Sequence, residues 1–281
     1  MGAPAPPHDP VYDPAMAAWV WQGRGPPLVA LHGFGGDGRD FEALAERLSG
    51  IEVLAPELAG HGRRADAPES EYLLDAQAGR LGELVAARLG GSRTPTGAPR
   101  VVVLGYSMGG RIAALAAFRG LLPASAHLVL VGAHPGLLSD AERAQRRADD
   151  ARLADAAEVE PAAFLEAFSA SPLLRSQASQ PEPWRSRRLA RRRLGPASGA
   201  ALAASLRVAG TAEQPALLDL PAPELSVSLV TGADDTKFTA LARQWAGRHP
   251  GWAVHVLPGG HACHLEATDA LAGVLRPLLK G

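Results

Sequence analysis

Short apolar runs alternate with amphipathic stretches through the first half of the chain. The runs Leu28–His32, Ile51–Ala55 and Val101–Leu104 have the length and composition typical of strands buried in a parallel sheet. Between them, apolar residues recur every three or four positions over 40–48 and 71–89, a spacing that predicts helices. The alternation predicts an α/β domain with a mostly parallel central sheet flanked by helices on both faces.

This alternation stops after a strand expected at 127–131. From about 139 to 220 the sequence contains only helical segments interrupted by prolines, and strand-like runs resume at 225–231 and 252–257. We therefore expect a helical lid inserted into the α/β core. The expected organisation is a first part of the core at 1–135, the lid at 136–220 and a second part of the core at 221–281.

The strand that begins at Val101 runs into a G-x-S-x-G segment, Gly105–Gly109, followed by an apolar helical stretch. Strand, tight turn and helix in this order are typical of a nucleophile elbow, in which the central serine is held in a strained turn. The two glycines allow the strand and helix backbones to approach each other closely. Ser107 is therefore the candidate nucleophile.

A serine nucleophile needs a base, and the base needs a carboxylate to orient it and stabilise its charged form. In an open α/β sheet, functional groups gather beyond the carboxyl ends of the strands. The loop after the run at 225–231 carries Asp234 and Asp235, and the loop after 252–257 carries His261. Spacing hardly separates the two aspartates. Ser107, Asp235 and His261 are predicted to form a catalytic triad, in the chain order of an α/β-hydrolase.

The glycine-rich loop that follows His32 has a predicted role beside the serine. In hydrolase folds one N–H from this loop and one from the residue after the nucleophile form an oxyanion hole. Here the two donors would be the backbone N–H groups of Phe34 and Met108. The histidines lack a paired ligand spacing and neither H-E-x-x-H nor C-x-x-C occurs, so no metal site is expected.

Composition narrows the classes of partner. The chain has 281 residues, a formal net charge of −1 and one cysteine, Cys263. Near-neutral charge offers no global attraction to nucleic acid or acidic membranes, and the basic run Arg185–Arg193 is interpreted as a charged lid helix. No secretory leader and no long apolar run is recognisable, so a cytoplasmic protein is expected.

Several segments together resemble one family. The chain is similar to α/β-hydrolase-fold proteins along nearly its whole length. Within that superfamily it resembles the 2-succinyl-6-hydroxy-2,4-cyclohexadiene-1-carboxylate synthases (MenH type) of menaquinone biosynthesis. The elbow segments are shared by many families, whereas the arginine after the elbow, the His-Pro-Gly stretch and Asp-x-Lys-Phe are more particular. The matching segments are Leu31–Gly36, Gly105–Arg111, His134–Leu137, Glu142–Asp149, Leu202–Arg207, Gly232–Phe238 and Gly260–Glu266.

The resemblance implies a lyase rather than a hydrolase. Members of the family eliminate pyruvate from 5-enolpyruvyl-6-hydroxy-2-succinyl-cyclohex-3-ene-1-carboxylate, without a cofactor, and use the triad serine and histidine to abstract a ring proton. The resemblance also selects Asp235 over Asp234. Where the family usually has Asp-Leu-Pro-Gly-His-Gly, this chain has Glu57–Gly62 with glutamate and alanine in the first and third positions.

A substrate with three carboxylates requires fixed cations near the reacting ring. Arg111, Arg146 and Arg193 are the candidate carboxylate-binding residues, because an arginine can grip a carboxylate through two parallel hydrogen bonds. The register around 194–198 leaves open whether Arg192 or Arg193 faces the pocket. Tyr106 and Lys237 are further candidates from the same motifs.

Two other functions remain open from the sequence. A serine esterase of the same fold would form an acyl-enzyme on Ser107 that water resolves. A binding protein that keeps the fold without the chemistry is the third possibility. The sequence does not predict an oligomeric state, and the only expected partner is a small polycarboxylate substrate.

Overall fold

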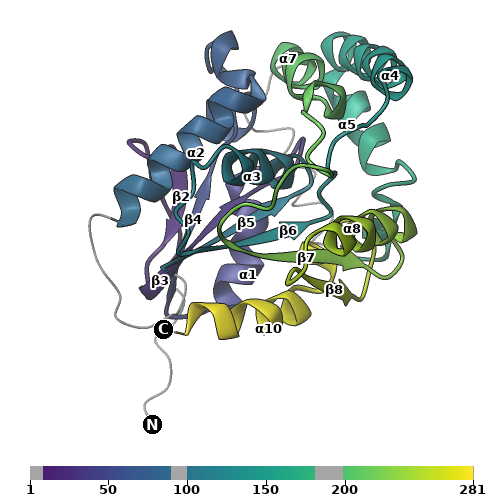
Figure 1. Ribbon diagram of the computed structural model, residues 1–281. Helices are drawn as coiled ribbons and strands as arrows, with labels where there is room; N and C mark the ends of the chain where they lie inside the picture. Colours follow the sequence, from purple (N-terminus) through teal and green to yellow (C-terminus); the bar gives the residue numbers. More distant parts are fainter. Residues whose placement is uncertain (1–8, 90–99, 181–198, 281) are drawn as a thin grey trace.

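The computed structural model describes residues 9–89, 100–180 and 199–280 (Figure 1). Eight strands in this part of the chain form one sheet. The strands are β1 (Val11–Asp13), β2 (Ala18–Trp21), β3 (Arg24–Leu31), β4 (Ile51–Pro56), β5 (Val101–Tyr106), β6 (Ala126–Val131), β7 (Ser226–Gly232) and β8 (Ala253–Leu257).

The strand order is β1-β2-β4-β3-β5-β6-β7-β8. The strands β1 and β2 form an antiparallel edge, and all pairs from β4 through β8 are parallel. The central strand β5 is buried along its whole length because both of its faces are covered. The predicted mostly parallel sheet is confirmed.

Helices cover both faces of the sheet (Figure 1). One core cluster joins the sheet to α2, α3 and α8, and a second joins it to α1 and α10. The α-helices of these two layers are α1 (Glu42–Arg47), α2 (Leu74–Leu89), α3 (Met108–Phe118), α8 (Thr236–Arg248) and α10 (Thr268–Leu279). Shorter segments between them are η1 (Gly38–Phe41), η2 (Gly62–Arg64), η3 (Glu69–Tyr72) and α9 (Cys263–Glu266).

Local hydrogen bonds refine two predicted helices. The helix expected over 40–48 is divided into η1 and α1. The side chain of Asp37 caps the start of η1 by accepting a bond from the Arg39 N–H. The helix expected from 71 begins at Leu74, after the separate turn η3.

Only helical elements lie between β6 and β7 in the described residues. They are α4 (Asp140–Val159), α5 (Pro161–Ser169), η4 (Arg175–Ser179), α7 (Gly199–Ala209) and η5 (Thr211–Glu213), and together they are called the helical insertion. The insertion stands above one end of the sheet in Figure 1 and has a small apolar cluster of its own. A helical region inserted after β6 is confirmed, and the boundaries 136–220 stay a prediction. The basic run Arg185–Arg193 lies outside the described residues.

Within the described parts of the chain, the helices are too short or too polar to cross a lipid bilayer.

Candidate active site

The three predicted triad residues come from three loops at one edge of the sheet. Ser107 directly follows β5, Asp235 lies between β7 and α8, and His261 follows β8. Because β5, β7 and β8 run in the same direction, their carboxyl ends meet at the edge that the helical insertion covers. Loops far apart in the sequence therefore converge there.

Ser107 has the backbone geometry of a strained turn. Its φ is +50°, which is rare for a residue other than glycine. A Cβ on Gly105 would lie 2.5 Å from the carbonyl oxygen of Gly109, and a Cβ on Gly109 would lie 2.5 Å from the carbonyl oxygen of His32. These close backbone approaches explain why the turn needs glycine on both sides of the serine.

Hydrogen bonds connect the three side chains in series. The Asp235 Oδ2 is 2.7 Å from the His261 Nδ1, and the His261 Nε2 is 3.1 Å from the Ser107 Oγ. Because Asp235 accepts the Nδ1–H, the neutral imidazole presents Nε2 as an acceptor for the serine hydroxyl. Asp234 is exposed, so tertiary structure separates the two aspartates that spacing could not.

The ring of His261 is confined on several sides. Its centroid is 4.4 Å from the Phe238 ring and 5.5 Å from the Tyr106 ring, and a Cβ on Gly132 would lie 2.9 Å from the imidazole. Tyr106 itself is buried, with its ring 3.9 Å from that of His264. Tyr106 is not among the residues lining the cavity described next, so the structure places this predicted substrate-binding residue behind the histidine.

A cavity of about 790 Å³ opens beside Ser107, between the sheet and the helical insertion. Phe34 and Met108 both line it, as Ser107 does. Met108 is the first residue of α3, where backbone N–H groups have no partner within the helix. The two residues whose backbone N–H groups are the predicted oxyanion donors therefore line the same cavity as the serine, and the role of those N–H groups stays a prediction. Among the described residues, no group of three or more His, Cys, Asp or Glu side chains is arranged to hold a metal ion.

One part of the cavity wall is cationic. Arg111 lies on α3, one turn after Ser107, with 7% of its surface exposed. Its guanidinium donates to the carbonyl oxygens of Ala209 and Gly210, at 2.7 and 3.2 Å, which fixes its position against α7. Burial, and then the charge of Arg146, lower the Arg111 pKa to about 10. The side chain therefore stays positively charged at neutral pH.

Arg146 on α4 also lines the cavity. Its Nε donates to the buried Asp150 Oδ2 at 2.8 Å, one turn along the same helix. This bond orients Arg146. The sequence does not predict it, because an arginine and an aspartate four positions apart on a polar helix have the same spacing as an ordinary ion pair on a solvent-exposed face. Lys237 lies just outside the lining, with its Nζ 5.9 Å from the centroid of the Phe238 ring. Arg193 and its alternative Arg192 lie outside the described residues.

His134 is a further lining residue, to which the sequence analysis assigned no role at the site. Burial, then the charges of Lys237, Arg111 and Arg146, lower its pKa to about 4. Its Nδ1 accepts the Gly136 N–H at 3.1 Å, so the neutral ring carries its proton on Nε2. The His-Pro-Gly motif is the sequence signal that could have pointed to His134. The nearby cations that help to keep its ring neutral come from other elements and could not be read from the motif.

The remainder of the cavity wall is largely apolar. It includes a group of phenylalanines, with the Phe34 ring centroid 5.2 Å from that of Phe168 and 6.2 Å from that of Phe164. Sequence reasoning did not single out the two phenylalanines of α5, because their position depends on how the insertion packs over the sheet. The site combines a strained serine, a histidine base, a cationic wall and an apolar wall.

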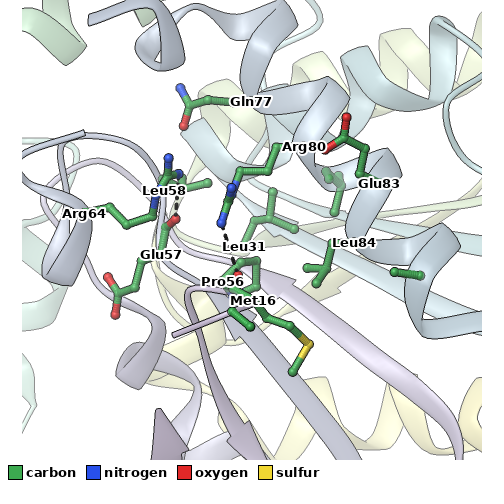
Figure 2. A pocket seen from close by; sticks show the side chains of 13 residues that line it. Met16, Leu31, Pro56, Glu57, Leu58, Arg64, Gln77, Arg80, Glu83 and Leu84 are labelled. Atoms are coloured by element: carbon green, nitrogen blue, oxygen red, sulfur yellow. Dashed lines mark hydrogen bonds between the residues drawn. The ribbon is translucent and has the colours of Figure 1, made fainter. Parts of the chain in front are cut away.

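Figure 2 shows a second cavity, of about 210 Å³, which is lined in part by α2 and shares no lining residue with the cavity beside Ser107. Arg64 and Arg80 reach toward it, but each guanidinium donates to a backbone carbonyl, of Glu57 and Met16 respectively. The Glu57 carboxyl group turns away from both arginines (Figure 2) and accepts bonds from the Trp19 Nε1 and the Gly38 N–H. No serine, cysteine or histidine lines this described cavity, so it offers neither a hydroxyl or thiol nucleophile of that kind nor a histidine base.

Comparisons with known proteins agree with this fold. A sequence profile described as the alpha/beta hydrolase family matches residues 28–274. Proteins named 2-succinyl-6-hydroxy-2,4-cyclohexadiene-1-carboxylate synthase from Salmonella paratyphi C and Salmonella newport are 33% identical over 260 residues, covering 89% of this chain and 94% of each relative.

Solved structures of the same fold cover nearly the whole chain. MenH from S. aureus has a TM-score of 0.81 at 23% identity, covering 94% of this chain and 98% of that chain. An esterase from Exiguobacterium antarcticum has a TM-score of 0.72 at 19% identity, covering 94% of this chain and 96% of that chain. At these identities the two structures establish the fold alone.

Proposed function

Because the chain belongs to the alpha/beta hydrolase family, we propose that it uses Ser107, His261 and Asp235 for an elimination rather than a hydrolysis. The proposed reaction removes pyruvate from 5-enolpyruvyl-6-hydroxy-2-succinyl-cyclohex-3-ene-1-carboxylate. It yields 2-succinyl-6-hydroxy-2,4-cyclohexadiene-1-carboxylate. The 33% identity to synthases that carry the product's name supports this choice within the family.

In the proposed reaction, the paired Ser107 and His261 remove a proton from the ring. The electrons of the C2–H bond form a double bond between C2 and C3, the existing double bond shifts from C3–C4 to C4–C5, and the bond from C5 to the enolpyruvyl oxygen breaks. The leaving group departs as the enolate of pyruvate, which takes up a proton to give pyruvate. Asp235 stabilises the imidazolium that results. Negative charge that develops on the substrate meets the N–H groups of Phe34 and Met108.

Arg111 is the observation that carries the proposal. A guanidinium this deeply buried beside a nucleophile is costly unless an anion compensates it. The carbonyl groups of Ala209 and Gly210 satisfy two of its donor nitrogens but carry no full charge. The buried carboxylate of Asp150 acts on Arg111 in the direction that raises its pKa, but Asp150 is bonded to Arg146, so one anion serves two arginines and a second negative charge is missing. A carboxylate of the substrate would supply that charge, with Arg146 as the second cation and Lys237 nearby. A third carboxylate-binding cation, Arg193 or Arg192, is proposed from the sequence alone.

Pyruvate release from the authentic enolpyruvyl substrate tests the proposal. We expect rapid release by the wild-type protein and only slow hydrolysis of p-nitrophenyl esters. Arg111→Ala should lower kcat/KM for elimination at least 100-fold, a loss of about 2.7 kcal/mol of transition-state stabilisation, while any ester hydrolysis changes little. The reason is that only the polyanionic substrate depends on the cation.

Arg119→Ala is the matched control for Arg111→Ala. Arg119 caps the other end of α3 and pairs with Asp75 at the surface, with 54% of its side chain exposed. This variant should retain wild-type elimination, and both variants should have similar melting temperatures. Fast ester turnover without pyruvate would contradict the synthase assignment, and inactivity in both assays would favour a binding protein.

The apolar wall of the cavity favours ester hydrolysis as a second candidate function. Phe34, Phe164 and Phe168 lie close to Ser107 and could accommodate an uncharged acyl group. An esterase would accumulate an acyl-enzyme on Ser107, which mass spectrometry of a rapidly quenched reaction would detect. The cationic wall opposes this alternative, because an uncharged ester gains nothing from it.

A further inference from the structure

A carboxylate outside the predicted triad connects the loop of His261 to the helical insertion. Glu266 is the last residue of α9, which follows that loop. Its Oε2 accepts the N–H of Gly260 at 2.6 Å, and its Oε1 accepts the hydroxyl of Ser176 at 2.8 Å. Gly260 immediately precedes His261, and Ser176 belongs to η4 of the insertion. One side chain therefore bridges the histidine loop and the insertion.

The three segments are packed without spare space. A Cβ on Gly260 would lie 2.3 Å from the Ser176 Oγ, and a Cβ on Gly259 would lie 2.6 Å from the Glu266 Oε2. Gly259 also has a φ of +94°, which favours glycine. The loop can approach both Glu266 and η4 only because its two glycines lack side chains. The bridge is thus built into the backbone of the loop.

The bridge reaches the reacting groups in two directions. On one side, the Gly260 N–H lies one residue before the imidazole that bonds to Ser107. On the other side, Ser171 and Leu173, which shortly precede η4, line the cavity. A change in the position of η4 would therefore affect both the cavity wall and the backbone that carries the base.

We propose that Glu266 is a positioning residue that holds His261 in register with Ser107 only while the helical insertion is seated on the histidine loop. The proposal rests on the Ser107–His261 chemistry of the proposed function but not on the identity of the substrate. Charge-assisted hydrogen bonds to a backbone N–H and a hydroxyl are short and directional, which suits this role. A displacement of about 1 Å at a base can cost about 100-fold in rate.

Three variants separate the two arms of the bridge. Glu266→Ala removes both bonds. Glu266→Gln keeps both, since its amide oxygen can accept the Gly260 N–H while its NH2 group donates to the Ser176 oxygen. Ser176→Ala removes only the arm to the insertion. Ser169→Ala is the matched control, because Ser169 also lies in the insertion but bonds to the Leu165 carbonyl of its own helix.

The rate at which a small fluorophosphonate labels Ser107 measures the serine–histidine pair without any substrate. We expect labelling to slow at least about 30-fold in Glu266→Ala and about 5-fold to 10-fold in Ser176→Ala. Glu266→Gln and Ser169→Ala should remain within about threefold of wild type. Melting temperatures should change by only a few degrees, because the triad loops keep their other contacts.

Proton NMR of the His261 Nδ1–H, which is hydrogen-bonded to Asp235, gives a second readout that requires no reaction. This downfield resonance should persist in Glu266→Gln and broaden or shift in Glu266→Ala and Ser176→Ala. Wild-type labelling and an unchanged resonance in Glu266→Ala would overturn the proposal. Equal losses in Glu266→Gln and Glu266→Ala, or no effect in Ser176→Ala, would also overturn it. Failure of pyruvate release would not alter these outcomes, so the two proposals are tested separately.

Discussion

Burial opposes the charge on both Arg111 and Glu57, but the two side chains respond differently. Arg111 remains charged at neutral pH, because even its lowered pKa of about 10 lies well above 7. Burial, then the nearby charge of Asp37, raises the Glu57 pKa from 4.5 to about 8, so Glu57 is mostly protonated at pH 7. The two side chains therefore have different interactions. Arg111 presents a positive charge to a ligand, whereas the neutral Glu57 accepts hydrogen bonds from Trp19 and Gly38.

The raised pKa of Glu57 predicts a pH dependence of stability. Between pH 4.5 and about 8 the folded state binds a proton that the unfolded state releases, so the free energy of unfolding falls as pH rises. This one group contributes a slope of up to about 1.4 kcal/mol per pH unit. Glu57→Gln mimics the neutral form and should remove the slope. Urea unfolding at pH 5 and pH 9 should show the variant becoming more stable than wild type only at pH 9.

Glu224→Gln is the control for this measurement, because Glu224 is exposed and should leave the slope unchanged. An equal slope in wild type and Glu57→Gln would show that Glu57 is ionised in the folded protein throughout this range.

At the scale of elements, the junction of β5 and α3 concentrates the backbone constraints of the site. The Ser107 N–H donates to the carbonyl of Val131 in β6, and the Gly109 N–H donates to that of His32 after β3. The elbow is therefore attached to both neighbouring strands. A second anchor lies at the start of α4, where the Arg143 guanidinium donates to the carbonyls of Leu137, Ala212 and Gln214 and ties both ends of the insertion together.

Gly109→Ala tests the close approach at the elbow. The new Cβ would lie 2.5 Å from the carbonyl oxygens of Leu31 and His32, and backbone atoms cannot yield as a flexible side chain would. We expect a loss of about 1–3 kcal/mol in the free energy of unfolding, and a severe loss of serine labelling. Chemical denaturation and fluorophosphonate labelling measure the two effects.

Gly79→Ala provides the matched comparison. Gly79 lies within α2, and a Cβ there meets nothing within 4 Å. The same substitution should stabilise the protein by about 0.5–1 kcal/mol and leave labelling unchanged. Similar destabilisation of both variants would contradict the close-approach explanation.

At the scale of the whole molecule, the candidate site lies where two separately packed units meet. The sheet supplies the serine, histidine and aspartate, whereas the insertion supplies Arg146 and the aromatic residues of α5. Arg111 crosses the junction, since it is carried by α3 and bonds to α7. A ligand in the cavity therefore contacts both units at once.

Ligand binding at this junction predicts a rise in thermal stability. At 100 times its Kd, the diene product should stabilise the folded state by about 2.7 kcal/mol. For a protein of this size that corresponds to about 5–10 °C in the unfolding temperature. Differential scanning fluorimetry measures the shift, with benzoate as a control ring that carries one carboxylate. Equal shifts from both compounds at equal concentration would mean that the cationic wall does not select polyanions.

Sequence patterns reached the architecture because they reflect interactions local to each element. The apolar run at 101–104 indicates a strand buried on both faces, and glycines at 105 and 109 indicate a turn that excludes side chains. The loops after the predicted strands placed Ser107, Asp235 and His261 at the carboxyl ends of the parallel sheet. By contrast, spacing alone hardly separates Asp234 from Asp235, and the end of β7 sets which one bonds to the histidine.

The amino-acid sequence alone determined the mostly parallel sheet, the helical insertion and the position of the serine, because periodicity and glycine placement express short-range constraints. Tertiary structure alone decided the contacts in and around the cavity: the bond between Arg146 and Asp150, the neutral His134 and the bridge from Glu266 to Ser176. These contacts depend on the distances between segments that come together only when the insertion packs over the sheet, and on the burial that results. The spacing of residues along the chain specifies neither the distances nor the burial.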